Sequence, residues 1–191
     1  MKAQSGRPRN PLIDEAVLRA AAELVLEVGY ADLTIAAIAE RAGTSKPAIY
    51  RRWPSKAHLV HEAAFRDGDE QLSLPETGSL HDDLAEMLRR TAAAFADPVA
   101  RALTPGLMAE IAADPSLHPA LLERFGGAWK GFHDRMATAA ANGVARADID
   151  TDVLIETLAG ASLMRLLISP DALDEHWVEQ TTTLLMRGIS A

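Results

Sequence analysis

Residues 34–56 read TIAAIAERAGTSKPAIYRRWPSK and predict two short helices that meet at Gly43. In the first half, apolar residues recur at the spacing of one helix face, at Ile35, Ile38, Ala39 and Ala42. Thr34 can cap this helix, and Gly43 can end it by taking a positive φ. Ser45 can cap the second helix, and Pro47 falls in its first turn, where a missing N–H removes no helical bond. Two short helices joined by a glycine turn are typical of a helix-turn-helix unit.

The second of these helices has one strongly apolar residue, Ile49, and an otherwise small, aromatic or basic surface. A basic surface of this kind is usually a solvated face. We favour DNA binding, because the small residues beside Lys46 let the backbone approach base edges while Lys46 reaches guanine O6 and N7. Lys56 supports this interpretation, since a cation at the start of the next helix opposes the helix dipole unless an anion binds there.

This stretch resembles the DNA-binding domain of the TetR (tetracycline-repressor-like) family of bacterial transcriptional regulators. The resemblance covers roughly residues 13–59, and the matching motif positions are Ala39, Gly43, Ser45, Tyr50, Ser55 and Lys56. Trp53 stands where members commonly have phenylalanine, which keeps an aromatic side chain there. The resemblance implies that the second helix enters the major groove. It also implies phosphate contacts from Thr34, Tyr50 and Lys56.

A short basic arm precedes the first predicted helix. Arg7 and Arg9 flank a proline, and this segment is either a disordered tail or an arm that lies in a narrow A·T-rich minor groove. With this arm, the predicted DNA-binding residues are Arg7, Arg9, Thr34, Thr44, Ser45, Lys46, Pro47, Ala48, Tyr50, Arg51, Arg52 and Lys56.

Charge is divided unevenly along the chain. Residues 1–66 contain ten Lys or Arg and seven Asp or Glu, whereas residues 67–191 contain nine and twenty, which accounts for the total of −8. A basic first third is expected to face phosphate, and the acidic remainder repels it. The chain has no cysteine, no apolar run long enough to cross a bilayer and no secretion signal at its start. We therefore expect a cytoplasmic protein with no membrane partner.

The rest of the sequence predicts helices and no strands. The first helix is expected to place in the core Ile13, Val17, Ala20, Ala21, Leu24 and Val28. Later helices are expected at residues 55–65, after Ser79, after Asp97 with a kink or break at Pro105-Gly106, and at residues 115–141, 151–168 and 171–187. The chain is thus predicted to be all-α, with about nine helices. A helix-turn-helix DNA-binding domain is expected at residues 1–54, and a helical effector-binding and dimerisation domain at residues 55–191.

The helix predicted at residues 115–141 carries aromatic residues beside glycines, such as Trp129 and Phe132 beside Gly131. Large rings next to missing side chains form either an ordinary core or the wall of a cavity. The TetR resemblance implies a small hydrophobic effector in this part of the chain. The predicted pocket residues are Phe65, Leu84, Met87, Leu88, Phe95, Leu107, Met108, Ile111, Phe125, Trp129, Phe132 and Met136.

The last two predicted helices are apolar on more than one face. Such helices belong either to a larger internal core or to a two-fold interface, and small residues at 159–162 allow the close helix approach that an interface needs. A homodimer is also what the resemblance implies. The predicted interface residues are Leu158, Ala161, Ser162, Arg165, Leu166, Trp177, Thr181, Leu184 and Leu185.

An enzyme is not supported by the motifs. His58, His61 and Glu62 do not have the spacing of a metalloprotease site, and nucleophile-elbow and P-loop motifs are missing, so no metal, cofactor or catalytic residue is predicted. The alternatives are a helical protein-interaction module and a transcriptional activator without an effector. The function predicted here is a ligand-responsive DNA-binding repressor, which binds a palindromic operator as a dimer and is released by a small hydrophobic effector.

Overall fold

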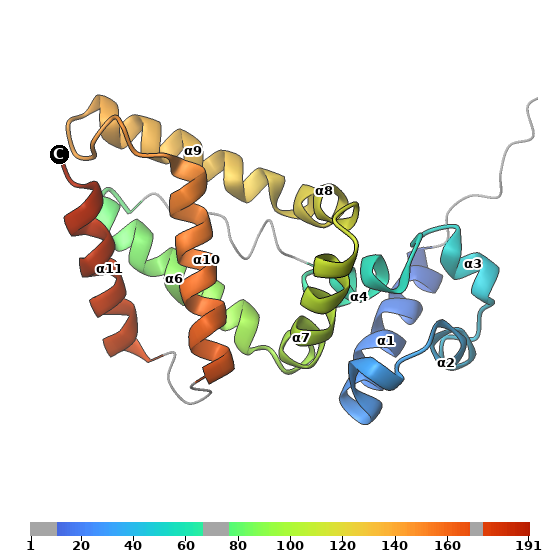
Figure 1. The fold of residues 1–191 in the computed structure, drawn as a ribbon. Coiled ribbons are helices and arrows are strands. Elements are labelled where there is room, and N and C mark those ends of the chain that lie inside the picture. The colour runs from blue at the N-terminus through green and yellow to red at the C-terminus, as the bar shows by residue number, and fades with distance from the viewer. Residues whose placement is uncertain (1–10, 67–76, 169–173) are drawn as a thin grey trace, which may run out of the picture. The chain divides into compact units, whose positions relative to one another are not determined.

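The computed structural model describes residues 11–66, 77–168 and 174–191. Figure 1 shows their helices, which are α1 (Pro11–Asp32), α2 (Ile35–Arg41), α3 (Lys46–Tyr50), α4 (Lys56–Ala64), α6 (Leu80–Ala96), α7 (Pro98–Ala113), α8 (Leu117–Leu122), the 3-10 helix η1 (Glu123–Phe125), α9 (Gly126–Ala141), α10 (Thr151–Ile168) and α11 (Glu175–Ile189). Within these ranges the only β-type pairing is an isolated bridge between Ala145 and Ser190. The prediction of an all-α chain is confirmed.

The chain divides into two compact units. The first comprises Met1–Arg66 and Ala102–Leu117, and the second comprises Asp67–Arg101 and His118–Ala191. The first unit therefore combines α1 to α4 with most of α7, although α6 lies between them in the sequence. It extends beyond the boundary predicted after residue 54, because α4 packs against α1.

α2 and α3 begin where side chains satisfy free backbone N–H groups. Thr34 Oγ1 accepts a hydrogen bond from Ala37 N at 3.1 Å, and Ser45 Oγ accepts one from Ala48 N at 3.4 Å. Gly43 has a φ of 63° and turns the chain between the two helices. The caps and the glycine turn predicted from the sequence are confirmed.

Apolar side chains from α1 to α4 form the core of the first unit. Those that are at most 1% exposed include Val17, Ala21, Val25, Ile38, Ile49, Leu59 and Val60. Two residues of the first helix that the sequence predicts in this core, Ile13 and Val28, are instead 44% and 45% exposed. The prediction is wrong for them because Ile13 lies in the first turn of α1 and Val28 precedes Gly29, whose φ of 75° interrupts the helix.

Trp53 lies in the loop that joins α3 to α4, and its side chain is buried. Its side chain is 3% exposed, and its Nε1 donates a hydrogen bond to Glu62 Oε2 at 3.0 Å. Ser55 Oγ accepts a hydrogen bond from His58 N at 3.4 Å and caps α4. The buried ring and the cap together fix where α4 begins.

The second half of α7 packs on Tyr30 of α1. A Cβ added to Gly106 would lie 2.1 Å from Tyr30 Cδ1, so the backbone of α7 lies directly against the ring. A kink or a break is predicted at Pro105-Gly106; α7 continues through Pro105, so the helix is not broken there. Leu103 and Leu107 are each 1% exposed, and their burial contributes about 3–6 kcal/mol, which outweighs the roughly 3 kcal/mol cost of an internal proline.

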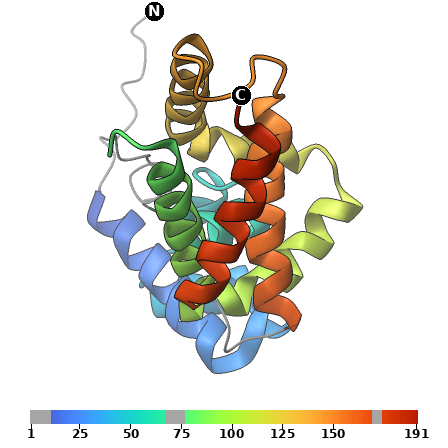
Figure 2. The same ribbon diagram turned by 90° about the vertical axis from the view of Figure 1, so that its left-hand side faces the viewer.

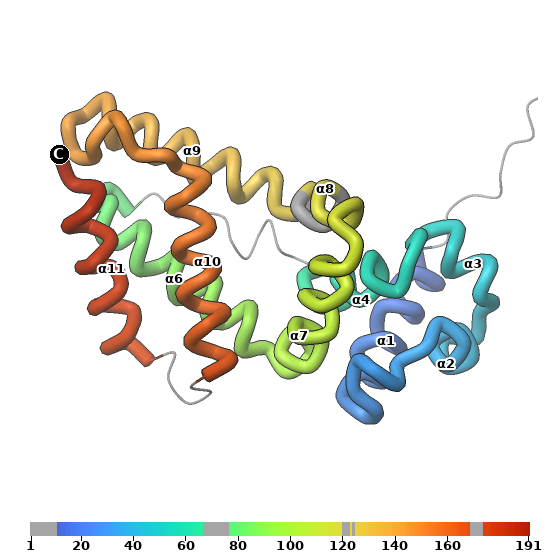
Figure 3. The backbone as a smooth tube through the Cα atoms, viewed as in Figure 1, coloured from blue at the N-terminus to red at the C-terminus, as the bar shows by residue number. Residues whose placement is uncertain are grey.

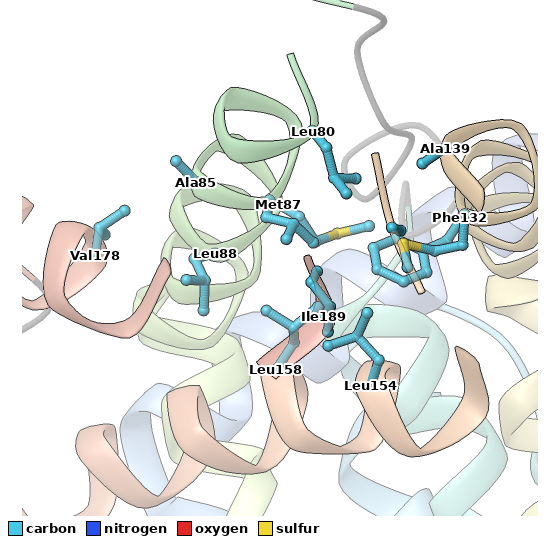
Figure 4. Packing of buried hydrophobic residues seen from close by; sticks show 13 residues of the cluster. Leu80, Ala85, Met87, Leu88, Phe132, Ala139, Leu154, Leu158, Val178 and Ile189 are labelled. Carbon is cyan, nitrogen blue, oxygen red and sulfur yellow. The ribbon is translucent and has the colours of Figure 1, made fainter. Parts of the chain in front are cut away.

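In the second unit, α10 and α11 both pack against α6. The two views in Figures 1 and 2 show these three helices side by side. Figure 4 shows the apolar cluster that they form with α9, in which Leu88 is 0% exposed and Phe132 is 1% exposed. Figure 3 shows the C-terminus beside the turn that follows α9, where Arg146 N donates a hydrogen bond to Ile189 O at 2.8 Å.

A buried carboxylate joins α6 to α9. Asp83 is 0% exposed, and its Oδ2 accepts a hydrogen bond from Arg135 Nε at 2.5 Å. Its Oδ1 accepts hydrogen bonds from the hydroxyl and the backbone N–H of Thr77, at 2.6 and 2.9 Å. Burial alone raises the pKa of Asp83, but the Thr77 hydrogen bonds and Arg135 outweigh burial and hold the pKa below its ordinary value.

The helix predicted over residues 115–141 is in fact interrupted. α8 ends at Leu122, η1 follows, and α9 begins at Gly126. The prediction of one long helix is wrong, because the adjacent pair Gly126 and Gly127 has low helix propensity and a tight 3-10 turn forms just before it. The predicted end of α9 is confirmed, since Gly143 follows it with a φ of 69°.

The last two helices lie close to where they are predicted. α10 spans the predicted residues 151–168, and α11 ends two residues later than predicted. Asp174 Oδ1 caps α11 by accepting a hydrogen bond from Trp177 N at 2.8 Å. The start predicted at residue 171 lies outside the described residues.

Candidate nucleic-acid interface

α3 presents an exposed surface on a buried support. Ile49 is 0% exposed and fixes the helix to the core, whereas Tyr50 is 50% exposed. Lys46 at the start of α3 and Arg51 just after it are also exposed. One short segment therefore presents two cations and a phenol to solvent, and each can donate hydrogen bonds to bases or phosphates.

Small and hydroxyl side chains surround Lys46. Pro47 is exposed and Ala48 is half-buried, so no large side chain adjoins Lys46 within the first turn. Thr34 and Ser45 use an oxygen lone pair for their caps and keep their hydroxyl protons, which remain able to donate to a phosphate oxygen. Thr44, also predicted to bind DNA, is half-buried.

Arg52 is engaged within the protein. Its guanidinium lies 2.5 Å from Asp14 Oδ2 and 5.8 Å from the centroid of the Trp53 ring. The predicted DNA contact from Arg52 would therefore compete with this ion pair. In the free protein Arg52 links the end of α3 to α1.

Lys56 is also engaged within the protein. Its Nζ lies 3.5 Å from Glu110 Oε1, donates a hydrogen bond to Tyr30 O at 3.3 Å and lies 3.9 Å from the centroid of the Tyr30 ring. The Tyr30 hydroxyl is buried without a hydrogen bond of good geometry among the described residues. Burial, together with the nearby Glu110 carboxylate, raises the pKa of Tyr30. No local sequence pattern indicates these partners, because Glu110 lies far along the chain.

An ion-pair clamp holds α2 on α1. Arg41 donates two hydrogen bonds of 2.8 Å to the carboxylate of Glu27 and lies 3.6 Å from Glu23 Oε2. The hydrogen bonds from Arg41 lower the pKa of Glu27. A bidentate pair of this kind restricts the orientation of the two side chains, so it helps to hold α2 beside α1. Sequence reasoning did not assign Arg41 this role.

The remaining arm residues, Arg7 and Arg9, lie outside the described residues. Their predicted contact with the minor groove stays a prediction.

The residues predicted to line an effector pocket fall into three groups. Core packing of the second unit includes Leu84, Met87, Leu88, Phe132 and Met136. Partly exposed positions of the second unit are Phe95, Phe125 and Trp129. The first unit contains Phe65, Leu107, Met108 and Ile111. Seven of the twelve are thus buried in a core, five in the second unit and two, Phe65 and Leu107, in the first. The candidate lining that remains in the second unit lies at the end of α6, just before α9 and in the first turn of α9.

The residues predicted at a dimer interface are also divided. Leu158, Ser162 and Leu166 are buried by their own chain, and Ser162 Oγ donates a hydrogen bond to Leu158 O at 2.9 Å. Leu184 is 71% exposed. Partial exposure is found for Ala161, Arg165, Trp177, Thr181 and Leu185.

α10 carries an exposed apolar face that sequence reasoning missed. It consists of Val153, Met164, Leu167 and Ile168, which are 54–69% exposed. These positions are spaced by 11, 3 and 1 residues, so they share one side of the helix. The spacing is visible in the sequence, but several faces of this helix are apolar and the sequence does not show which one its own chain covers.

No helix in the described ranges is long and apolar enough to cross a membrane. The arrangement of α1 to α4, with α3 exposed, is that of a helix-turn-helix DNA-binding protein. The family described as "Bacterial regulatory proteins, tetR family" matches residues 17–63, and "Tetracyclin repressor-like, C-terminal domain" matches residues 74–185. The chain belongs to the TetR family of transcriptional regulators.

Individual relatives agree with this assignment. The chain is 27% identical over 199 residues to the uncharacterized HTH-type transcriptional regulator YdeS of Bacillus subtilis strain 168, with 100% of this chain and 96% of YdeS covered. It is 30% identical over 173 residues to the DNA-binding transcriptional repressor TetR of Mycobacteroides abscessus, with 85% and 86% covered. The crystal structure of TetR family transcription regulator SCO0332 has a TM-score of 0.69 and 31% identity, with 94% of this chain and 99% of that chain covered. Salmonella enterica GusR has a TM-score of 0.70 at 22% identity, with 92% and 94% covered, and shows the fold alone.

Proposed function

We propose that this TetR-family regulator is a repressor that binds a two-fold symmetric operator as a homodimer and leaves it when a small apolar effector binds. The observation that carries the proposal is the α3 segment, in which buried Ile49 supports exposed Lys46, Tyr50 and Arg51. Repression is the activity named for the relative from Mycobacteroides abscessus. Catalysis is not part of the proposal, and the protein acts in the cytoplasm, where its operator lies.

In the proposed complex, α3 lies in the major groove. Lys46 reads a guanine edge, and Tyr50 and Arg51 contact the flanking backbone. Thr34 donates its hydroxyl proton to a phosphate, and Lys56 pairs with another. The basic arm at residues 7–9 reaches the adjacent minor groove.

The dimer is proposed to form through the exposed apolar face of α10, together with Leu184 of α11. Four apolar residues on this face are more than half exposed, and their contact with water is unfavourable. A second copy of the chain packed on this face would shield them from water. Gly160 lies within α10 and has no other atoms within 4 Å of an added Cβ, so a second helix can approach closely there.

The effector site is proposed beside Trp129 in the second unit. Trp129 and Phe125 are only partly buried, although both are large aromatic residues with a glycine within two positions of each. A planar apolar molecule could stack on them with little loss of existing packing. Because operator and effector bind the same protein, each should lower the binding affinity of the other by the same factor.

DNA footprinting on the region upstream of the protein's own gene tests the operator. We expect two protected half-sites with centres about one helical turn, roughly 34 Å, or slightly more apart. The matched control is Lys46→Ala, which should weaken the sequence preference at one base pair of each half-site and leave the phosphate contacts in place. Protection of a single half-site by a monomer at saturating protein would contradict the proposal.

Tryptophan fluorescence tests the effector. A variant with Trp53→Phe and Trp177→Phe keeps Trp129 as its one reporter, since the chain has three tryptophans. A library of small aromatic compounds should contain members that quench Trp129, and their affinity should fall when operator DNA is present. Equal affinity with and without operator would remove the effector part of the proposal and leave operator binding unaffected.

A further inference from the structure

We propose that Glu110 competes with operator phosphate for Lys56, so that the Glu110 carboxylate lowers the affinity of the protein for operator DNA. This inference rests on the proposed function, in which Lys56 pairs with a phosphate. The competing groups all belong to the first unit: Lys56 begins α4, Tyr30 is in α1, and Glu110 lies in the second half of α7.

The ammonium of Lys56 is held from several sides. It lies within ion-pair distance of Glu110, donates to Tyr30 O and rests over the Tyr30 ring. An ammonium has three N–H donors, of which Tyr30 O accepts one, and the Glu110 carboxylate lies close enough to neutralise its charge. The side chain of Lys56 is nevertheless 24% exposed and that of Glu110 is 36% exposed, so a phosphate can reach the pair from solvent.

The Lys56 ammonium cannot pair fully with a phosphate and with the Glu110 carboxylate at the same time. If Lys56 moves to the phosphate, its ion pair with Glu110 is lost. If Lys56 stays and bridges the two anions, the carboxylate and the phosphate repel each other at a separation of a few ångströms. In both geometries the Glu110 charge lowers operator affinity.

The position of Glu110 is fixed by the backbone of α7. Gly106 lies one helical turn before Glu110 and is in direct contact with the Tyr30 ring, over which Lys56 lies. A glutamate on a flexible loop could move away from an arriving phosphate at little cost. Glu110 stands on a helix whose close approach to Tyr30 keeps the carboxylate beside Lys56.

The size of the effect follows from the exposure of the pair. Partly exposed ion pairs change an equilibrium by up to about fivefold, so removing the Glu110 charge should raise affinity about two- to fivefold per subunit. A dimer has two such pairs, and the operator affinity of Glu110→Gln should rise about four- to twenty-five-fold.

A double-mutant cycle tests the competition. Operator affinity is measured by fluorescence anisotropy for the wild type, Glu110→Gln, Lys56→Met and the double variant, with the footprinted operator as the probe. Glu40→Gln is the charge-matched control, because Glu40 is an exposed carboxylate of α2 outside the contacts of Lys56. Circular dichroism checks that each variant is folded, and Glu110→Asp, which keeps the charge but shortens the side chain, serves as a second variant with an intermediate expected gain.

The competition predicts that Glu110→Gln binds more tightly than both the wild type and Glu40→Gln, and that this gain disappears when Lys56→Met is also present. A gain that persists in the double variant, which has no ammonium at this position, would reflect general charge and would overturn the inference. Weaker binding by Glu110→Gln would also overturn it, because Glu110 would then position Lys56 for DNA.

The same measurements separate this inference from the proposed function. If Lys56→Met weakens operator binding but Glu110→Gln has no effect, only the competition is wrong. If Lys56→Met leaves affinity unchanged, the phosphate contact assigned to Lys56 is wrong as well. If the wild type binds no operator, the proposed function itself fails.

Discussion

Lys46 and Tyr50 belong to the same five-residue helix, yet they are expected to contribute differently to binding. Lys46→Ala should reduce discrimination at one base pair of each half-site by about 1–3 kcal/mol, because a base-edge contact is lost. Tyr50→Phe should weaken all sequences alike by about 1 kcal/mol, because only a phosphate hydrogen bond is removed. Affinities for a set of operators with single base changes measure both effects. If Lys46→Ala lowered the affinity for every operator sequence by the same factor, Lys46 would not contact a base edge.

Asp83 should make the stability of the second unit depend on acidity. Its pKa is lower in the folded state than in the unfolded chain, so its contribution is present above the ordinary pKa of Asp, about 3.9. That contribution is lost as the pH falls through the lower folded-state pKa. Asp83→Asn should cost about 3 kcal/mol at neutral pH, because it leaves Arg135 without its carboxylate partner.

Urea unfolding of the wild type and Asp83→Asn between pH 3 and pH 7 measures this contribution. The difference between the two proteins should narrow at the acid end of the range. The control is Asp148→Asn, since the Asp148 pair with Arg146 is exposed and should contribute little at any pH. A difference that stays constant with pH would show that the Asp83 charge is not what stabilises the fold.

At the scale of helices, replacing either of two helical glycines by alanine is expected to change the stability of the protein in opposite directions. Gly106→Ala should destabilise the first unit by about 1–2 kcal/mol, because the new Cβ overlaps three atoms of the Tyr30 ring and this outweighs the gain in helix propensity. Gly131→Ala in α9 should stabilise by up to about 1 kcal/mol, because nothing lies within 4 Å of its Cβ position. Thermal unfolding of the two variants measures the contrast, and stabilisation by both would show that Tyr30 is free to move.

The same contrast explains how far the sequence could predict the elements. Caps such as Thr34 and Ser45 act within three residues, so their effect could be predicted from local sequence and is found in the structure. The contact of Gly106 with Tyr30 spans 76 residues and leaves no periodic signal. Pro105 therefore predicts a kink or a break, and tertiary packing prevents the break. The partners of Lys56 could not be identified from the sequence for the same reason.

A second feature that the sequence could not predict is which face of a helix is buried when several of its faces are apolar. The apolar residues of α10 are evident in the sequence, but the predicted interface includes Leu158 and Leu166, which the chain buries itself. Which face remains exposed depends on where α6 and α11 pack, and that information is not local. Lys46, Tyr50 and Arg51 are predicted correctly on the surface because the single buried residue of α3, Ile49, fixes its orientation.

At the scale of the whole molecule, the exposed face of α10 should determine the oligomeric state. Met164→Asp combined with Leu167→Asp should raise the dimer dissociation constant at least about a hundredfold, because two unpaired carboxylates would be buried in the interface. Operator affinity should fall in parallel. Leu26→Asp on α1, where the leucine is equally exposed at 54%, is the control and should leave the dimer intact. Sedimentation velocity measures the state, and an unchanged dimer in the double variant would place the interface elsewhere.

The discontinuous make-up of the first unit also affects how the protein is synthesised. Tyr30 leaves the ribosome 76 residues before Gly106, so at translation rates of about 5–20 residues per second its ring waits roughly 4–15 s for the helix that covers it. Lys56 itself is made 54 residues before Glu110, so for the later part of that time the nascent helix-turn-helix has Lys56 without its internal competitor. Ribosome-bound chains stalled before and after residue 117 should differ in proteolysis near Tyr30, with protection in the longer chain. The DNA-reading helices are thus made before the helix that restrains Lys56.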